Sequence, residues 1–123
     1  MEKNGGGVIL TITSMAAENK NINMTSYASS KAAASHLVRN MEFDLGEKNI
    51  RVNGIAPGAI LTDALKSVIT PEIEQKMLQH TPIRRLGQPQ DIANAALFLC
   101  SPAASWVSGQ ILTVSGGGVQ ELN

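Results

Sequence analysis

Three short runs of apolar and β-branched residues predict strands at residues 8–13, 51–56 and 110–114. The first run is almost continuously apolar, which is typical of strands buried on both faces of a parallel sheet. A polar, glycine-rich segment precedes it, and Pro57-Gly58 ends the second run. The remaining runs of apolar positions follow a longer period.

Between the first two runs, apolar residues recur at spacings of three and four, which predicts a long helix. We expect Thr25 or Ser26 to cap its start, and Gly46 to end it in the left-handed conformation. Residues 14–23, just before it, are small and polar and predict a loop. The apolar face of the helix is predicted to consist of Ala34, Leu37, Val38, Met41 and Leu45.

The segment 59–90 predicts only short helices, because Pro82, Gly87 and Pro89 interrupt it. One of them is expected to start at Thr70-Pro71-Glu72, where a cap, a first-turn proline and an acid follow in order. A further helix is expected over about residues 89–101. Its apolar face is predicted to consist of Ile92, Ala95, Ala96 and Leu99.

Strands and helices alternate along the chain, so the predicted fold class is α/β. Right-handed crossovers would place about three parallel strands side by side, with helices across them, in a single unit over residues 1–123. The first strand would have an unpaired edge, which favours association with another chain.

Composition excludes several classes of protein. The 123 residues carry 10 basic and 10 acidic side chains, so no basic excess indicates a nucleic-acid partner. No segment approaches the length of a membrane span, and the first twenty residues do not resemble a secretion signal. A single cysteine, Cys100, fits a reducing compartment, and we therefore expect a cytoplasmic protein.

Several remaining residues are given packing roles. His36 and His80 have no ligand-like spacing with each other or with Cys100, so no metal site is predicted. Cys100 is expected to be a small core residue, and Trp106 is expected to fill a packing gap rather than bind a ligand. Arg84-Arg85 is too short for a nucleic-acid patch, although it could orient an acidic group near a site.

The chemistry centres on Tyr27, the only tyrosine, and on Lys31, which lies four residues later on the same helix face. Tyrosine titrates near pH 10, and lowering its pKa by about 3 units requires roughly 4 kcal/mol from a group such as an ammonium. The phenol would then exchange a proton with an alcohol near neutral pH. A lysine follows at this spacing by chance about one time in twenty, so the pair alone leaves a structural role open.

Two further segments are expected at the same place. Ser14 follows the first strand and Pro57–Thr62 ends the second, and open parallel sheets bind ligands at the carboxyl ends of their strands. The Ser14 hydroxyl could donate to a substrate oxygen beside Tyr27. Free backbone groups and the Thr62 hydroxyl suit a flat polar group such as a carboxamide.

The chain resembles the short-chain dehydrogenases/reductases. The matching pieces extend through the whole chain in the family's order: Ser14, Tyr27–Lys31, Ile50–Asn53, Pro57–Thr62, Gly109–Ile111 and Gly116-Gly117. The resemblance implies an NAD-dependent oxidoreductase with the carboxy-terminal half of a Rossmann-like, doubly wound sheet. Family members are about twice this length, so the half with the glycine-rich pyrophosphate turn is expected to be absent.

The resemblance also implies residue roles. Tyr27 would be the acid/base, Lys31 would lower its pKa and hold the nicotinamide ribose, and Ser14 would bind the reacting oxygen. The nicotinamide carboxamide would be held by Ile60, Leu61 and Thr62. Gly5–Gly7 precedes its strand and Gly116–Gly118 has no helix after it, so neither suits a phosphate. This argues against autonomous binding of NAD.

Within the family, the likeness extends to members that act on steroid or bile-acid hydroxyls. Asn19 is then a candidate substrate contact, and residues 63–85 would form a mobile cover. We expect the catalytic half of such an enzyme, with little turnover alone. The alternative is a non-catalytic association module that forms homo-oligomers or captures its complementary amino-terminal half.

Glu42 departs from the family pattern, which has a small apolar residue at this point of the helix. Because the helix packs on a partner subunit in the family, a carboxylate there would disturb that contact. Arg39, three residues earlier, could partly neutralise it.

Overall fold

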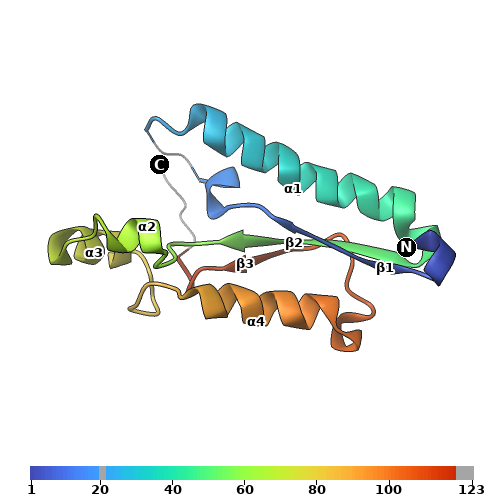
Figure 1. Ribbon diagram of the computed structural model, residues 1–123. Coiled ribbons are helices and arrows are strands. Elements are labelled where there is room, and N and C mark those ends of the chain that lie inside the picture. Colours follow the sequence, from blue (N-terminus) through green and yellow to red (C-terminus); the bar gives the residue numbers. More distant parts are fainter. Residues whose placement is uncertain (20–21, 119–123) are drawn as a thin grey trace.

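Three parallel strands form one sheet, and the long helices lie above and below it (Figure 1). The computed structural model describes residues 1–19 and 22–118. Its strands β1 (Gly7–Ile12), β2 (Ile50–Pro57) and β3 (Ile111–Val114) follow the order β1-β2-β3. β1 pairs with β2 from Gly7–Ile50 onward, and β2 pairs with β3 from Gly54–Ile111 onward. The predicted strands are confirmed to within one residue at each end.

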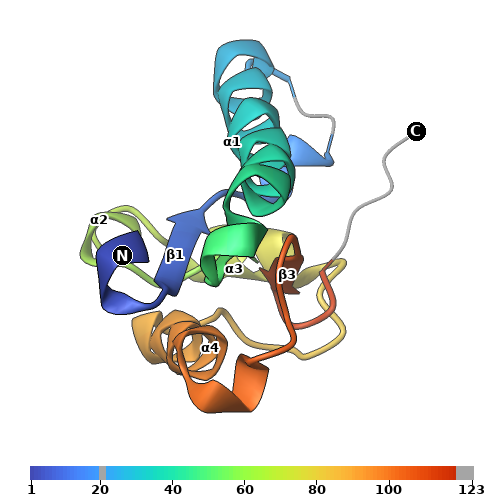
Figure 2. The same ribbon diagram turned by 90° about the vertical axis from the view of Figure 1, so that its right-hand side faces the viewer.

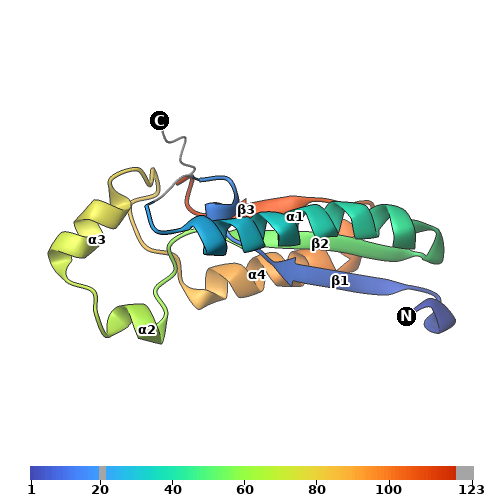
Figure 3. The same ribbon diagram turned by 90° about the horizontal axis from the view of Figure 1, so that it is seen from above.

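The helices cover the sheet on both faces. α1 (Thr25–Leu45) lies across one face and α4 (Pro89–Cys100) across the other, as the end-on view in Figure 2 shows. The short helices α2 (Asp63–Lys66) and α3 (Pro71–Leu78) lie beyond the carboxyl ends of the strands (Figure 3). This layered arrangement confirms the α/β class. Four single 3₁₀ turns complete the described elements: η1 (Glu2–Asn4), η2 (Met15–Ala17), η3 (Gly46–Lys48) and η4 (Pro102–Ala104).

The core lies between α1 and the middle strand. Val38 of α1 and Val52 of β2 are both completely buried, and Ile50 is 6% exposed. β2 is buried along most of its length, whereas every residue of β1 retains some exposure and Ile12 is 46% exposed. The prediction that the first strand is buried on both faces is therefore wrong. The reason is that β1 pairs only with β2 among the described strands and so lies at an edge.

The ends of α1 differ from the prediction. Met24 is the N-cap rather than Thr25 or Ser26, and Gly46 has right-handed dihedrals (φ −59°) because the chain continues into η3. In the turn between α1 and β2, the residue with left-handed dihedrals is Asn49, at φ 60°. Asparagine tolerates this conformation, and its side-chain Nδ2 donates to Gly5 O at 2.8 Å. The turn into β2 is thus fixed by an asparagine contact instead of a glycine.

The exposed sides of the helices correct further predictions. Leu37 is 53% exposed, and Ser35 is buried near Val38 instead. The predicted inner face of α4 is confirmed, with Leu99 only 2% exposed. Cys100 is the residue after Leu99, so its side chain is rotated by about 100° around the helix axis from the buried face. It is exposed, and its predicted core role is therefore wrong. Trp106 is 99% exposed, because it lies in the turn after η4 and not under a helix.

Two sequence features outside the core are also resolved. Thr70 caps α3 as predicted, since its Oγ1 accepts from Ile73 N at 3.2 Å. Glu42 lies against the turn before β3, where a Cβ at Gly109 would be 3.1 Å from its Cγ. Among the ion pairs of the described residues, a Glu42–Arg39 pair does not occur, so Arg39 makes no direct contact with the Glu42 carboxylate. None of the described helices is long and apolar enough to cross a membrane.

Candidate functional site at the carboxyl edge of the sheet

Ser14 lies just past the end of β1. Thr13 before it is buried, and its Oγ1 donates to Ile55 O at 3.2 Å, which holds the end of β1 against β2. Ser14 caps η2, since its Oγ accepts from Ala16 N at 3.1 Å. This bond uses a lone pair of the oxygen, so the Ser14 hydroxyl can still donate to a substrate oxygen. η2 packs against α1, the helix that carries Tyr27 and Lys31.

Tyr27 and Lys31 lie on one face of α1. The Lys31 Nζ is 5.7 Å from the centre of the Tyr27 ring, and it donates to Ile12 O at 3.4 Å. The ammonium group therefore links the helix to the end of β1. Tyr27 is 47% exposed, so its phenol is accessible to a ligand. An accessible phenol beside an anchored cation is suited to proton transfer.

The segment after β2 crosses the same edge of the sheet. Ile60 forms an isolated parallel bridge with Gly87, in which Leu61 N donates to Gly87 O at 2.8 Å and Gly87 N donates to Ala59 O at 2.9 Å. Thr62 caps α2, because its Oγ1 accepts from Leu65 N at 3.3 Å. The Thr62 hydroxyl thus already has one bond as an acceptor and can still act as a donor.

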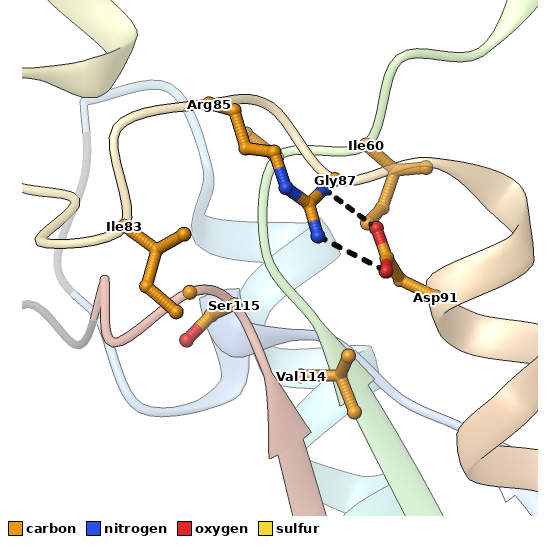
Figure 4. A pocket seen from close by; sticks show the side chains of 9 residues that line it. Ile60, Ile83, Arg85, Gly87, Asp91, Val114 and Ser115 are labelled. Carbon is orange, nitrogen blue, oxygen red and sulfur yellow. Dashed lines mark hydrogen bonds and ion pairs between the residues drawn. The ribbon is translucent and has the colours of Figure 1, made fainter.

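A cavity of about 230 Å³ lies beside this segment (Figure 4). Ser14, Tyr27 and Lys31 are not among its lining residues. The cavity is therefore distinct from these three residues, and it adjoins the segment after β2 through Ala59 and Ile60. Its lining includes Ile60, Ile83, Arg85, Asp91, Val114 and Ser115.

Arg85 and Asp91 form an ion pair that was not predicted from the sequence. Arg85 Nη1 and Nη2 lie 2.8 and 3.1 Å from the two carboxylate oxygens of Asp91, and Gln88 N donates to Asp91 Oδ2 at 2.7 Å. The hydrogen bonds from Arg85 and then from the Gln88 amide lower the pKa of Asp91 from 3.8 to about 2. The signal for this site was the spacing Gln88-Pro89-Gln90-Asp91, in which an acid at the third helical position faces its own N-cap.

Other predicted site residues are placed as follows. Asn19 is half-buried in the loop between Ser14 and α1, and residues 20–21 of that loop lie outside the described residues. Gly5 and Gly6 precede β1 and Gly7 is its first residue, so all three lie at the opposite end of the sheet. Gly116 and Gly117 have φ of 65° and 84° and pack against residues 81–83. Within residues 1–19 and 22–118, no group of His, Cys, Asp and Glu side chains is arranged to hold a metal ion.

Comparisons with known proteins agree on one family. The family described as enoyl-(acyl carrier protein) reductase matches residues 1–118. The 7α-hydroxysteroid dehydrogenase of Escherichia coli K12 is 99% identical over the whole chain, which covers 48% of that protein. The enzyme of the same name from Clostridium sardiniense is 39% identical over 95% of the chain and 45% of its own length.

A solved structure also matches the full chain. It is described as a 7α-hydroxysteroid dehydrogenase complexed with NADH and 7-oxo glycochenodeoxycholic acid. It has a TM-score of 0.92 at 99% identity, over 100% of this chain and 48% of that one. The chain thus spans about half the length of the relatives it matches.

Proposed function

Since the chain belongs to the short-chain dehydrogenase/reductase family, we propose that it is the catalytic half of an NAD-dependent oxidoreductase. The proposed reaction interconverts a secondary alcohol, a 7α-hydroxysteroid or bile acid, with its ketone. The observation that carries the proposal is the Tyr27–Lys31 pair, with Nζ 5.7 Å from the ring centre and anchored on Ile12 O.

The proposed proton transfer uses Ser14, Tyr27 and Lys31. In alcohol oxidation, the Tyr27 oxygen takes the hydroxyl proton while Ser14 donates a hydrogen bond to the same substrate oxygen. NAD, when bound, supplies the acceptor for the hydride that leaves the alcohol carbon. Lys31 stabilises the tyrosinate by its positive charge, and its remaining ammonium hydrogens can bind the nicotinamide ribose. Ketone reduction is the reverse.

The residues present fit one end of the cofactor. Ile60–Thr62 lies at the carboxyl edge and is fixed by Gly87, where a Cβ would lie 2.6 Å from Ile60 Cδ1. This fixed segment and the Thr62 hydroxyl would hold the nicotinamide carboxamide. The described residues offer no comparable site for the diphosphate of NAD, because they contain no glycine-rich turn that leads from a strand directly into a helix. The proposed contacts to NAD are therefore limited to its nicotinamide end.

A bile acid is the proposed substrate class because two relatives with this chemistry match across nearly the whole chain. Asn19 would contact the steroid from the loop after η2. The segment 63–85, with α2 and α3 beyond the carboxyl edge, would cover it. Limited cofactor contacts lead us to expect little or no turnover by the chain alone.

The test joins this chain, in one polypeptide, to the part of the E. coli enzyme that it does not span. With NAD and a 7α-hydroxy bile acid, nicotinamide absorbance should report turnover in the fusion and little in the chain alone. We expect Tyr27→Phe to lower kcat at least about 100-fold, because it removes the proton-transfer group. Lys31→Met should also lower it strongly.

Lys48→Met is the matched control, since Lys48 pairs with Glu2 at the opposite end of the sheet, at 3.6 Å. It should leave kcat unchanged. Full activity of the Tyr27→Phe fusion would rule out the proposed proton transfer. Robust turnover by the chain alone would contradict the expected inactivity.

A second candidate function is association without catalysis. It is favoured by the edge position of β1 and by exposed aromatic side chains, with Phe43 83% and Trp106 99% exposed. The proposed occupant of the β1 edge is the part of its relatives' length that this chain does not span. The two functions combine if the fusion is active and the chain alone is not.

A further inference from the structure

Gly87 holds the segment after β2 through both of its backbone groups. Its N–H donates to Ala59 O at 2.9 Å, and its carbonyl accepts from Leu61 N at 2.8 Å. The Ile60 side chain packs on the same glycine, since a Cβ there would lie 2.6 Å from Ile60 Cδ1. The two peptide groups flanking Gly87 therefore determine where the main chain of residues 59–61 lies.

The opposite ends of these two peptide groups are held by side chains. Leu86 O shares a peptide group with Gly87 N and accepts from Arg85 Nη1 at 3.0 Å. Gln88 N shares a peptide group with Gly87 O and donates to Asp91 Oδ2 at 2.7 Å. A peptide group is planar, with its N–H and C=O pointing in opposite directions, so fixing one end orients the other.

Arg85 and Asp91 also fix each other. Their two parallel contacts of 2.8 and 3.1 Å, drawn as dashed lines in Figure 4, form a bidentate pair. Single exposed ion pairs contribute little, whereas bidentate geometry restrains both partners. Asp91 stands in the first turn of α4, and Leu86 is only 3% exposed. Asp91 is thus held by α4, and Arg85 is held by its hydrogen bond to the carbonyl of the buried residue Leu86.

We propose that Arg85 and Asp91 are positioning residues that set the main chain of Ala59–Leu61 through the two peptide groups of Gly87. Neither side chain bonds to this segment directly among the contacts described. The consequence for nicotinamide binding rests on the function proposed above. A displacement of about 1 Å in a ligand-positioning segment can cost about 100-fold in rate, so such support matters for the site.

The test is amide hydrogen exchange, measured residue by residue by NMR on the chain itself. The variants are Asp91→Asn, which removes the ion pair, and Arg85→Gln, which keeps the Asp91 cap. Both should speed exchange at the Gly87 and Leu61 amides by about tenfold or more. The Gly54 amide, bonded to Gln110 O at 2.8 Å in the sheet, should be unaffected.

Arg84→Gln is the matched control, because the described hydrogen bonds of the Arg84 side chain go to the main-chain carbonyls of residues 78 and 79. It should leave Gly87 and Leu61 unchanged. Unchanged exchange at these amides in both test variants would overturn the proposal. Equal acceleration at Gly54 would overturn it as well, because it would show a general loss of stability.

A titration with nicotinamide mononucleotide separates this inference from the proposed function. We expect the amide signals of residues 60–62 to shift in the unmodified chain, and Asp91→Asn to weaken that binding several-fold. Equal affinity in the variant would overturn the positioning role for the ligand. Nicotinamide mononucleotide could shift none of these signals while the exchange at Gly87 and Leu61 still accelerates in the variants. That outcome would contradict the cofactor role of residues 60–62 and would still support the positioning of their main chain by Arg85 and Asp91.

Discussion

Lys31 contacts two parts of the site with one ammonium group. It lies over the Tyr27 ring and donates to the carbonyl of Ile12, the last residue of β1. The strand end therefore restrains the lysine and, through it, the charge near the phenol. Ser14, two residues further on, belongs to the same strand end. The geometry of the candidate site therefore depends on the residue at which β1 ends, as well as on the identity of the site's side chains.

Asp91 leads to a prediction on pH. Its folded pKa of about 2 lies below the ordinary 3.8, so the unfolded chain binds the proton more readily. The carboxylate therefore stabilises the fold above about pH 4, and this contribution disappears as the pH falls toward 2. Urea unfolding should show Asp91→Asn less stable than the unmodified chain at pH 7, with a difference that shrinks on acidification.

Asp63→Asn is the comparison for this experiment, since the side chain of Asp63 is fully exposed and lies 4.0 Å from Lys66. Its effect at pH 7 should be smaller. A stability difference for Asp91→Asn that stays constant from pH 7 to pH 3 would contradict the role given to the carboxylate.

The packing of α1 on β2 belongs to the scale of elements. Val38 and Val52 are completely buried at this contact, and Ile9 and Ile111 of the outer strands surround them. The site residues Tyr27 and Lys31 lie toward the amino end of the same helix. The orientation of α1, and hence the position of the tyrosine, therefore depends on a few aliphatic contacts.

Val38→Ala should lower the free energy of unfolding by about 2 kcal/mol, because it removes buried methyl groups and leaves a cavity. Leu37→Ala is the matched control on the same helix, since Leu37 is 53% exposed. We expect it to cost less than about 1 kcal/mol. Urea denaturation measures both, and equal losses for the two variants would contradict the assigned packing of α1.

At the scale of the whole molecule, the three-stranded sheet and its helices leave large apolar side chains exposed to solvent. Among the described residues, Phe43 on α1, Leu97 on α4 and Trp106 after η4 are all at least 72% exposed. Such surface commonly marks contacts with other chains. In addition, β1 pairs with β2 alone among the described strands, so its other backbone edge is open to a further strand.

We therefore expect the chain to associate in solution. Sedimentation equilibrium should give an average mass that rises above 13.0 kDa with concentration. Phe43→Ser combined with Trp106→Ser should lower that mass, because both substitutions remove exposed aromatic surface. A chain that remains monomeric at high concentration would contradict this expectation.

The sequence by itself determined where the strands and main helices lie, and it predicted the residues of the candidate site. Periodicity placed three strands and the main helices, because apolar spacing reflects which side of an element is buried. The motif residues Ser14, Tyr27, Lys31 and Ile60–Thr62 were predicted because their order matches that of a family, and their roles remain predictions. Predictions that depended on the surroundings failed: Leu37, Cys100 and Trp106 are apolar in type, yet all three side chains are exposed in the described chain.

Tertiary structure alone decided the contacts between segments distant in sequence. Asn49 rather than Gly46 takes the left-handed conformation, because the partner of its side chain is Gly5, 44 residues away. The bridge from Ile60 to Gly87 likewise joins two loops that meet only after the sheet has formed. Because these contacts join residues far apart in the sequence, only the folded chain shows which residues lie around the candidate site.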